Sequence, residues 1–306
     1  HGDDRRQRQM CIRDSLRVLE ASLFGPRTRF VIHELTGDIL SIQGRWDEAE
    51  EQYDHALPIA VKHKLTTPLA RIYSSRADLA VKKGEMDNAL SLHKKALEMQ
   101  IKLRDAQGAA RSYNNMGYIF RRQRDNKRAI EVYGNVEELL ESEDSPDLTE
   151  ARIRLASAFL EMGEMDRARD HAMKAHDETA ENNQEKLHAR SRAVLGRYYA
   201  RIKDNDLAMH HYTGALEILS DQSDPRSAVE VEILLGQVLS DAGSTEEAAQ
   251  HYLDALSIAE ANDFRMMQGE ILSRLGEVES NRSQRMDYLQ RSLVVFRELG
   301  AVDRMR

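Results

Sequence analysis

The sequence predicts an all-α fold, a right-handed α-solenoid of about seven helix-turn-helix repeats. The first observation is a series of small residues that recurs at steps of 40 residues, with a single step of 39. Its members are Gly37, Ala77, Gly117, Ala156, Gly196, Gly236 and Gly276. The second observation is composition: 31% charged residues, 41% hydrophobic residues and only five prolines favour helices over strands. A fixed period of this length is the signature of stacked supersecondary units.

Two further small-residue series follow the same period and predict a second helix in each unit. One consists of Ala49, Ala89, Ala129, Ala168, Ala208 and Ala248. The other consists of Ala56, Ala96, Val136, Ala175, Ala215 and Ala255. Members of the two series lie seven residues apart, so they share one helix face. Large residues between them, including Tyr53, Tyr133, Tyr212 and Tyr252, are interpreted as packing residues.

The turn between the two helices of a unit has its own signature. The stretches QGRWDEA, KGEMDNA, MGEMDRA and AGSTEEA each place a glycine before an Asp or a Ser/Thr. Such a glycine can end a helix in the left-handed conformation, and the following polar residue can cap the next helix. The units are expected near 30–69, 70–109, 110–148, 149–188, 189–228, 229–268 and 269–306.

The prolines support these boundaries. Pro26, Pro68, Pro146 and Pro225 each precede a small-residue landmark by about ten residues, where a first helix should begin. Pro58 lies inside an expected second helix, where we expect a bend.

These features resemble the tetratricopeptide repeat (TPR). Ser112–Val136 and Leu234–Leu256 carry the resemblance most clearly. The repeat is about six residues longer than the common 34-residue form. It is therefore similar to the long-repeat branch found in Pins/LGN-type adaptors, Rap regulators and the helical domain of MalT-like activators.

The amino-terminal segment does not follow the period. RRQRQMCIRDS, residues 5–15, reads as the translation of a sequencing-library adapter, so we expect residues 1–15 to be non-native. Without these residues the formal net charge changes from -8 to -9, and the only cysteine is lost. Residues 16–29 are expected to be the tail of a truncated repeat, with the native gene continuing upstream.

Several function classes are disfavoured by the sequence. The acidic net charge argues against direct nucleic-acid binding, and no apolar run is long enough to span a membrane. Phosphate-binding glycine loops, HExxH, paired CxxC and GxSxG motifs are absent, and no two histidines lie four residues apart. We therefore expect no enzyme activity, no cofactor, no metal and a cytoplasmic location.

The expected binding surface is the concave face lined by first helices. Polar and aromatic residues were assigned to it by helical spacing from the packing positions. They are Arg71, Lys82, Arg111, Asn114, Asn115, Tyr118, Arg122, Arg154, Arg190, Arg197 and Arg201. Ser75 and Asp78 share the same face of the second unit, and Glu150 and Glu161 flank Arg154. Arg111 with Asn115 resembles the lining by which Pins/LGN-type repeats hold an extended peptide.

The sequence therefore predicts a protein-interaction scaffold that binds an extended or helical, acidic segment of a protein or peptide partner. The alternative is the regulatory arm of a larger signalling protein or MalT-like transcription regulator, whose catalytic or DNA-binding domain lies upstream.

Overall fold

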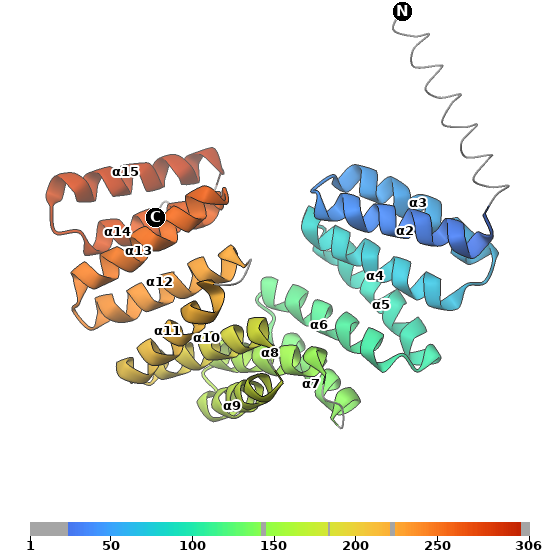
Figure 1. The fold of residues 1–306 in the computed structure, drawn as a ribbon, viewed down its shortest axis with the longest axis horizontal. Helices are drawn as coiled ribbons and strands as arrows, with labels where there is room; N and C mark the ends of the chain where they lie inside the picture. Colours follow the sequence, from blue (N-terminus) through green and yellow to red (C-terminus); the bar gives the residue numbers. More distant parts are fainter. Residues whose placement is uncertain (1–23, 142–144, 183, 221–223, 301–306) are drawn as a thin grey trace, which may run out of the picture. The chain divides into compact units, whose positions relative to one another are not determined.

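The computed structural model describes residues 24–141, 145–182, 184–220 and 224–300, and all regular structure in these ranges is helical (Figure 1). The predicted all-α helical-repeat solenoid is confirmed, with seven helical hairpins in the described ranges. The adapter-like segment 1–15 and the expected helix tail at 16–23 lie outside them. The chain divides into two compact units, His1–Glu143 and Asp144–Arg306.

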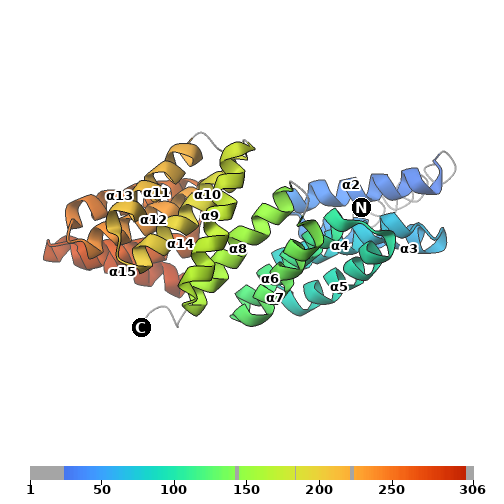
Figure 2. The same ribbon diagram turned by 90° about the horizontal axis from the view of Figure 1, so that it is seen from below.

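The first unit contains three hairpins. Their helices are α2 (Pro26–Ile42), α3 (Trp46–Lys62), α4 (Thr66–Lys83), α5 (Met86–Leu103), α6 (Ala106–Arg122) and α7 (Asn126–Leu140). The first helices α2, α4 and α6 lie side by side within this unit, as Figure 2 also shows from below.

The second unit contains four hairpins. Their helices are α8 (Pro146–Met162), α9 (Met165–Glu181), α10 (Glu185–Arg201), α11 (Asn205–Ser220), α12 (Pro225–Asp241), α13 (Thr245–Ala261), α14 (Arg265–Val278) and α15 (Arg282–Glu298). Each of the seven hairpins begins three or four residues before the expected unit boundary. Residues 26–29 accordingly form the first turn of α2 rather than the tail of a preceding repeat.

Proline and capping residues set the helix starts. Helices α2, α8 and α12 begin at Pro26, Pro146 and Pro225, as predicted. Ser145 caps α8 by accepting a hydrogen bond from the backbone N–H of Asp147 at 3.3 Å. Pro68 differs, because α4 begins two residues earlier at Thr66.

The small residues of the second helices form the interior. Every member of the series from Ala49 to Ala248, and of the series from Ala56 to Ala255, has no exposed surface. The tyrosines Tyr53, Tyr133, Tyr212 and Tyr252 are at most 1% exposed, which confirms their interpretation as packing residues. Each tyrosine ring lies directly against the glycine 16 residues before it, where a side chain would leave no room for the ring.

Two hairpins depart from the glycine-tyrosine pairing in a consistent way. Where the first position is Ala77, the tyrosine is replaced by His93; where it is Ala156, the tyrosine is replaced by Ala172. The shorter last hairpin keeps the glycine, and the side chain of Leu289 packs against Gly276.

Candidate functional site

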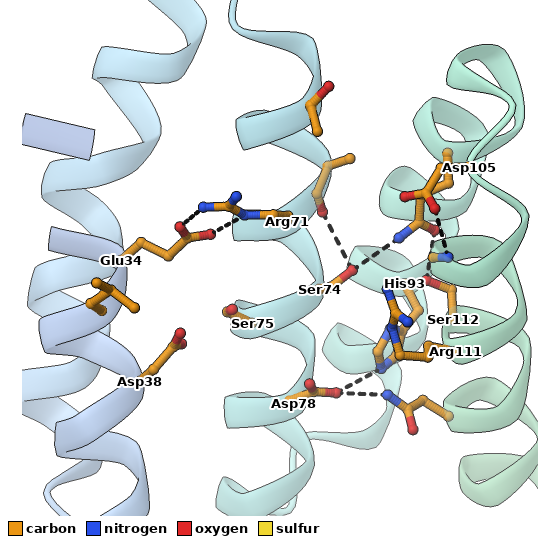
Figure 3. Close-up of a pocket in the computed structure, with 16 residues that line it drawn as sticks. Glu34, Asp38, Arg71, Ser74, Ser75, Asp78, His93, Asp105, Arg111 and Ser112 are labelled. Atoms are coloured by element: carbon orange, nitrogen blue, oxygen red, sulfur yellow. Dashed lines mark hydrogen bonds and ion pairs between the residues drawn. The ribbon is translucent and has the colours of Figure 1, made fainter. Parts of the chain in front are cut away.

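A pocket of about 480 Å³ opens on the first unit between α2, α4 and α6, with α5 behind them. Because these first helices repeat with the 40-residue period, residues in equivalent positions line up across the pocket. Arg71 and Arg111 are one such pair, and Ser75 and Asn115 are another. The second helix α5 contributes His93 and Gln100 (Figure 3).

Most polar groups of the pocket bond to one another. Arg71 forms an ion pair with Glu34 of α2, and its Nε donates to Glu34 Oε1 at 2.9 Å. Ser112 Oγ donates to Gln100 Oε1 at 2.8 Å. Asp105 caps α6 by accepting from the backbone N–H of Gly108 at 2.9 Å. These groups form the rigid wall of the pocket.

Two aspartates of the pocket, on adjacent helices, accept hydrogen bonds from uncharged side chains. Asp38 of α2 accepts a hydrogen bond from the Tyr53 hydroxyl at 2.7 Å. Asp78 of α4 accepts one from Asn115 Nδ2 of α6 at 2.8 Å. Neither carboxylate forms an ion pair with a described arginine or lysine. Desolvation by the pocket walls raises the pKa of Asp78 to about 6, against the opposing charge of Lys82 and with a smaller contribution from Asp38.

His93 is a buried polar residue without a hydrogen bond. Its side chain has no exposed surface, and neither ring nitrogen makes a hydrogen bond with any described residue. The nearest polar contact is from Nε2 to Asp78 Oδ1, at 3.6 Å. Burial lowers the pKa of His93 to about 4, so the ring is neutral at physiological pH. An unsatisfied buried polar group is costly, which makes this position unusual in a native interior.

The structure brings together some of the site residues expected in the first unit. Arg71, Arg111 and Asn115 line the pocket. Lys82 lies outside it and donates to Ser41 Oγ at 2.8 Å. Tyr118 and Arg122 are exposed on α6 without lining the pocket.

Asn114 does not fit the expectation of an open binding surface. Its side chain is only 4% exposed, whereas that of Asn115 faces the pocket. Consecutive helix residues point about 100° apart, which separates the two asparagines. Helical spacing from Gly117 alone does not distinguish the two positions.

In the second unit, the expected arginines bind carboxylates of this chain. Arg154 and Arg190 both form ion pairs with Glu150 of α8, the Arg190 Nη2 to Glu150 Oε1 distance being 2.9 Å. Arg197 lies 4.0 Å from Glu161. Burial acts to raise the pKa of Glu150, but the two arginines outweigh it and hold this pKa below its ordinary value. Arg201 is exposed at the end of α10. The positive charges expected on this surface are therefore largely neutralised by Glu150 and Glu161.

A histidine cluster in the second unit was missed from the sequence. The rings of His176 and His188 stack with centroids 4.8 Å apart, and His211 lies 5.9 Å from His176 and stacks on Tyr199. Burial and Arg192 lower the pKa values of these three histidines, that of His211 to about 4. His211 does belong to a 40-residue series with His171 and His251, but this spacing does not predict that His211 meets His176.

A second polar group joins α12 and α13. Glu232, His251 and Asp254 each bring one potential ligand atom to within 4.8 Å of the others. His251 Nδ1 lies 2.7 Å from Glu232, a contact that an ordinary ion pair explains, so we assign no metal to this group. None of the described helices combines the length and apolar character needed to cross a membrane.

These features define a helical-repeat protein of the tetratricopeptide type with a polar pocket on its first helices. Residues 25–268 match the family described as the MalT-like TPR region, and the chain belongs to this family. No curated protein matches the sequence.

Solved structures share the fold at low sequence identity. BtubC from P. vanneervenii is 23% identical with a TM-score of 0.60, over 72% of this chain and 92% of that one. A Rap protein complexed with Competence and Sporulation Factor is 15% identical with a TM-score of 0.62, over 88% and 77%. A signal transduction ATPase with a tetratricopeptide repeat sensor, from Pyrococcus horikoshii, is 15% identical with a TM-score of 0.67, over 89% of this chain but only 43% of that one.

Proposed function

We propose that this chain is a protein-interaction module that binds a peptide segment of a partner in the pocket of the first unit. The observation that carries the proposal is the pocket itself, whose volume of about 480 Å³ lies within the range of ligand sites. The helices α2, α4 and α6 present carboxylate, guanidinium, amide and hydroxyl groups on its walls. These groups can form hydrogen bonds with a peptide backbone and with polar side chains. A structural neighbour of the Rap type is described in complex with a peptide, which supports the same use of the fold.

A second candidate is a sensor arm of a larger regulator. The match to the MalT-like TPR region and the likeness to a tetratricopeptide repeat sensor favour it. The two candidates are compatible, because a sensor arm also acts by binding. The absence of catalytic activity, the acidic character of the partner and the cytoplasmic location remain predictions.

Site-specific photocrosslinking tests the proposal. Leu35 lines the pocket and is 54% exposed, so benzoylphenylalanine at this position would react with a bound segment. The matched control is benzoylphenylalanine at Leu253, which is 39% exposed on α13 of the second unit. We expect one partner segment crosslinked at position 35 and not at 253. Equal labelling at both positions, or none at 35, would contradict pocket binding.

The same crosslinking experiment tests whether the bound segment is acidic. Arg111→Glu should strongly reduce the crosslink if the segment is acidic, because a repulsive carboxylate replaces the guanidinium at the pocket wall. An unchanged or stronger crosslink would refute the acidic character while leaving peptide binding intact.

A further inference from the structure

The pocket of the first unit contains carboxylates that form no ion pair with a described arginine or lysine, whereas the sequence led us to expect a basic surface. Glu34 and Arg71 neutralise each other, and Asp105 is occupied with the start of α6. Asp38 and Asp78 remain as carboxylates with hydrogen-bond donors but no bound cation among the described residues. In Figure 3, Asp38 projects from α2 towards α4, whereas Asp78 extends from α4 towards α6, where it accepts from Asn115; both line the same pocket.

His93 adds a third acceptor on the same wall. It is fully buried, lines the pocket and leaves both ring nitrogens without a hydrogen bond. A neutral imidazole has one donor and one acceptor nitrogen. If its N–H faces Asp78, 3.6 Å away, the other nitrogen still offers a lone pair. The five hairpins with glycine at the packing position place Tyr or Leu here; the two with alanine place His93 and Ala172, so an alanine at the packing position does not by itself require a polar ring.

The polar groups of the pocket that Arg71 does not neutralise therefore include two carboxylates, each with a hydrogen-bond donor but without an ion pair to a described arginine or lysine. Carboxylates accept only, and a guanidinium supplies five N–H donors in a planar fork with a permanent positive charge. Building on the proposed function, we infer that the pocket binds the guanidinium of an arginine within a partner's peptide segment, with Asp38 and Asp78 as its acceptors. Asn115 holds Asp78 in position through its side-chain amide.

The size of the pocket favours a peptide over the free amino acid. A volume of about 480 Å³ accommodates more than one side chain, and the Arg71–Glu34 pair and Arg111 lie on the same lining. Residues flanking the arginine would contact these groups. Charge selection of this kind depends on the two aspartates rather than on the arginines expected from the sequence.

Binding of degenerate hexapeptide pools to the full 306-residue chain tests the inference. One pool has arginine fixed at the third position, and matched pools have citrulline or glutamate there. Citrulline keeps the shape of arginine without its charge. By biolayer interferometry, we expect the arginine pool to be retained at least about tenfold more than the citrulline pool, as a charge-assisted hydrogen bond implies. Free arginine amide should compete only weakly.

The Asp38→Asn/Asp78→Asn variant should abolish this preference. The control is Asp170→Asn/Asp287→Asn, which makes the same change in net charge at exposed positions of the second unit. It should keep the preference. Circular dichroism and thermal melting check that both variants fold, and Asp78→Asn alone serves if the double variant does not.

The outcomes separate the inference from the proposed function. Retention of all pools alike, preference for glutamate, or an arginine preference that survives in the double variant would overturn the guanidinium site but leave peptide binding standing. Competition by free arginine amide at the affinity of the peptides would overturn the peptide as the ligand. Retention of no pool would overturn both.

Discussion

The ring of Tyr252 covers Gly236 so closely that a Cβ at position 236 would lie 2.6 Å from Tyr252 Cε1. The same relationship joins Gly196 to Tyr212, at 2.5 Å. Four of the described hairpins therefore close through a missing side chain on one helix and a tyrosine ring on the other. This complementarity fixes the distance between the two helices of a repeat.

Gly236→Ala is expected to destabilise the second unit by about 1–3 kcal/mol, because the ring of Tyr252 has to move from a well-packed position. Urea unfolding followed by circular dichroism measures the effect. Gly134→Ala is the matched control, since no atom lies within 4 Å of its Cβ position; it should gain about 1 kcal/mol in helix propensity.

The alanine-histidine pair of the second hairpin provides a double-mutant test. Gly236→Ala/Tyr252→His copies the Ala77 and His93 pair, so the two substitutions should couple favourably by about 0.5–3 kcal/mol. Strictly additive effects would show that the two positions do not compensate each other.

The turn between α10 and α11 places a lysine where four equivalent turns place glycine and one places Arg124. Lys203 has a φ of 63°, while Gly163, 40 residues earlier, has a φ of 79°. A side chain in this left-handed region costs roughly 1–2 kcal/mol, and glycine returns part of this through unfolded-state entropy. Lys203→Gly should therefore stabilise the chain by up to about 1 kcal/mol, and Gly163→Ala should destabilise it by about 1 kcal/mol. A lower free energy of unfolding in urea for Lys203→Gly, or a higher one for Gly163→Ala, would contradict this interpretation of the turns.

Binding of the arginine peptide pool should weaken as the pH falls through about 6, the pKa to which the pocket raises that of Asp78. Protonation removes the charge that attracts the guanidinium. The groups around Asp78 are Lys82 on its own helix, Asp38 on α2, Asn115 on α6 and His93 on α5. His93 stays neutral because burial lowers its pKa to about 4.

The stability of the folded chain responds to Asp78 in the opposite direction. Since the pKa of Asp78 is higher in the folded state than its ordinary 3.8, folding is favoured by protonation, and this contribution is lost as the pH rises from about 4 to 6. Asp78→Asn should remove both effects, which are measured by interferometry between pH 5 and 7 and by thermal melting between pH 4 and 7. Retention that is constant over this range would contradict the role of Asp78.

The histidine cluster of the second unit should make folding sensitive to acid. Burial, and then the charge of Arg192, lower the pKa of His211 to about 4 in the folded state. A histidine with a lowered pKa binds fewer protons when folded, so stability is lost as the pH falls from 6.5 towards 4. His211→Phe keeps the stacking on Tyr199 without titrating, and it should reduce the fall in melting temperature between pH 7 and 5.

The control for this experiment is His63→Gln. His63 is exposed at the end of α3, so this substitution should leave the pH dependence unchanged. An equal pH dependence in His211→Phe and in the unmodified chain would show that the cluster does not control acid stability.

Much of the site followed from the period, and its decisive residue did not. Arg71, Asp78, Arg111 and Asn115 were placed on one face by spacing, and the structure places all four on one pocket. His93 is one of two positions, with Ala172, at which the tyrosine of the series is replaced, and the sequence does not show that its ring is left without a hydrogen bond.

The amino-acid pattern alone predicts the repeat, the number of hairpins and the residues of their interior. These properties are local, because a glycine or alanine every 40 residues allows helices to approach only in one register. Which charges remain available for a partner depends on the contacts between helices in the folded chain. Glu150 reaches Arg190 from 40 residues away, and Asp38 and Asp78 line one pocket without an ion pair to a described arginine or lysine, because pairing depends on how side chains of neighbouring helices meet in space.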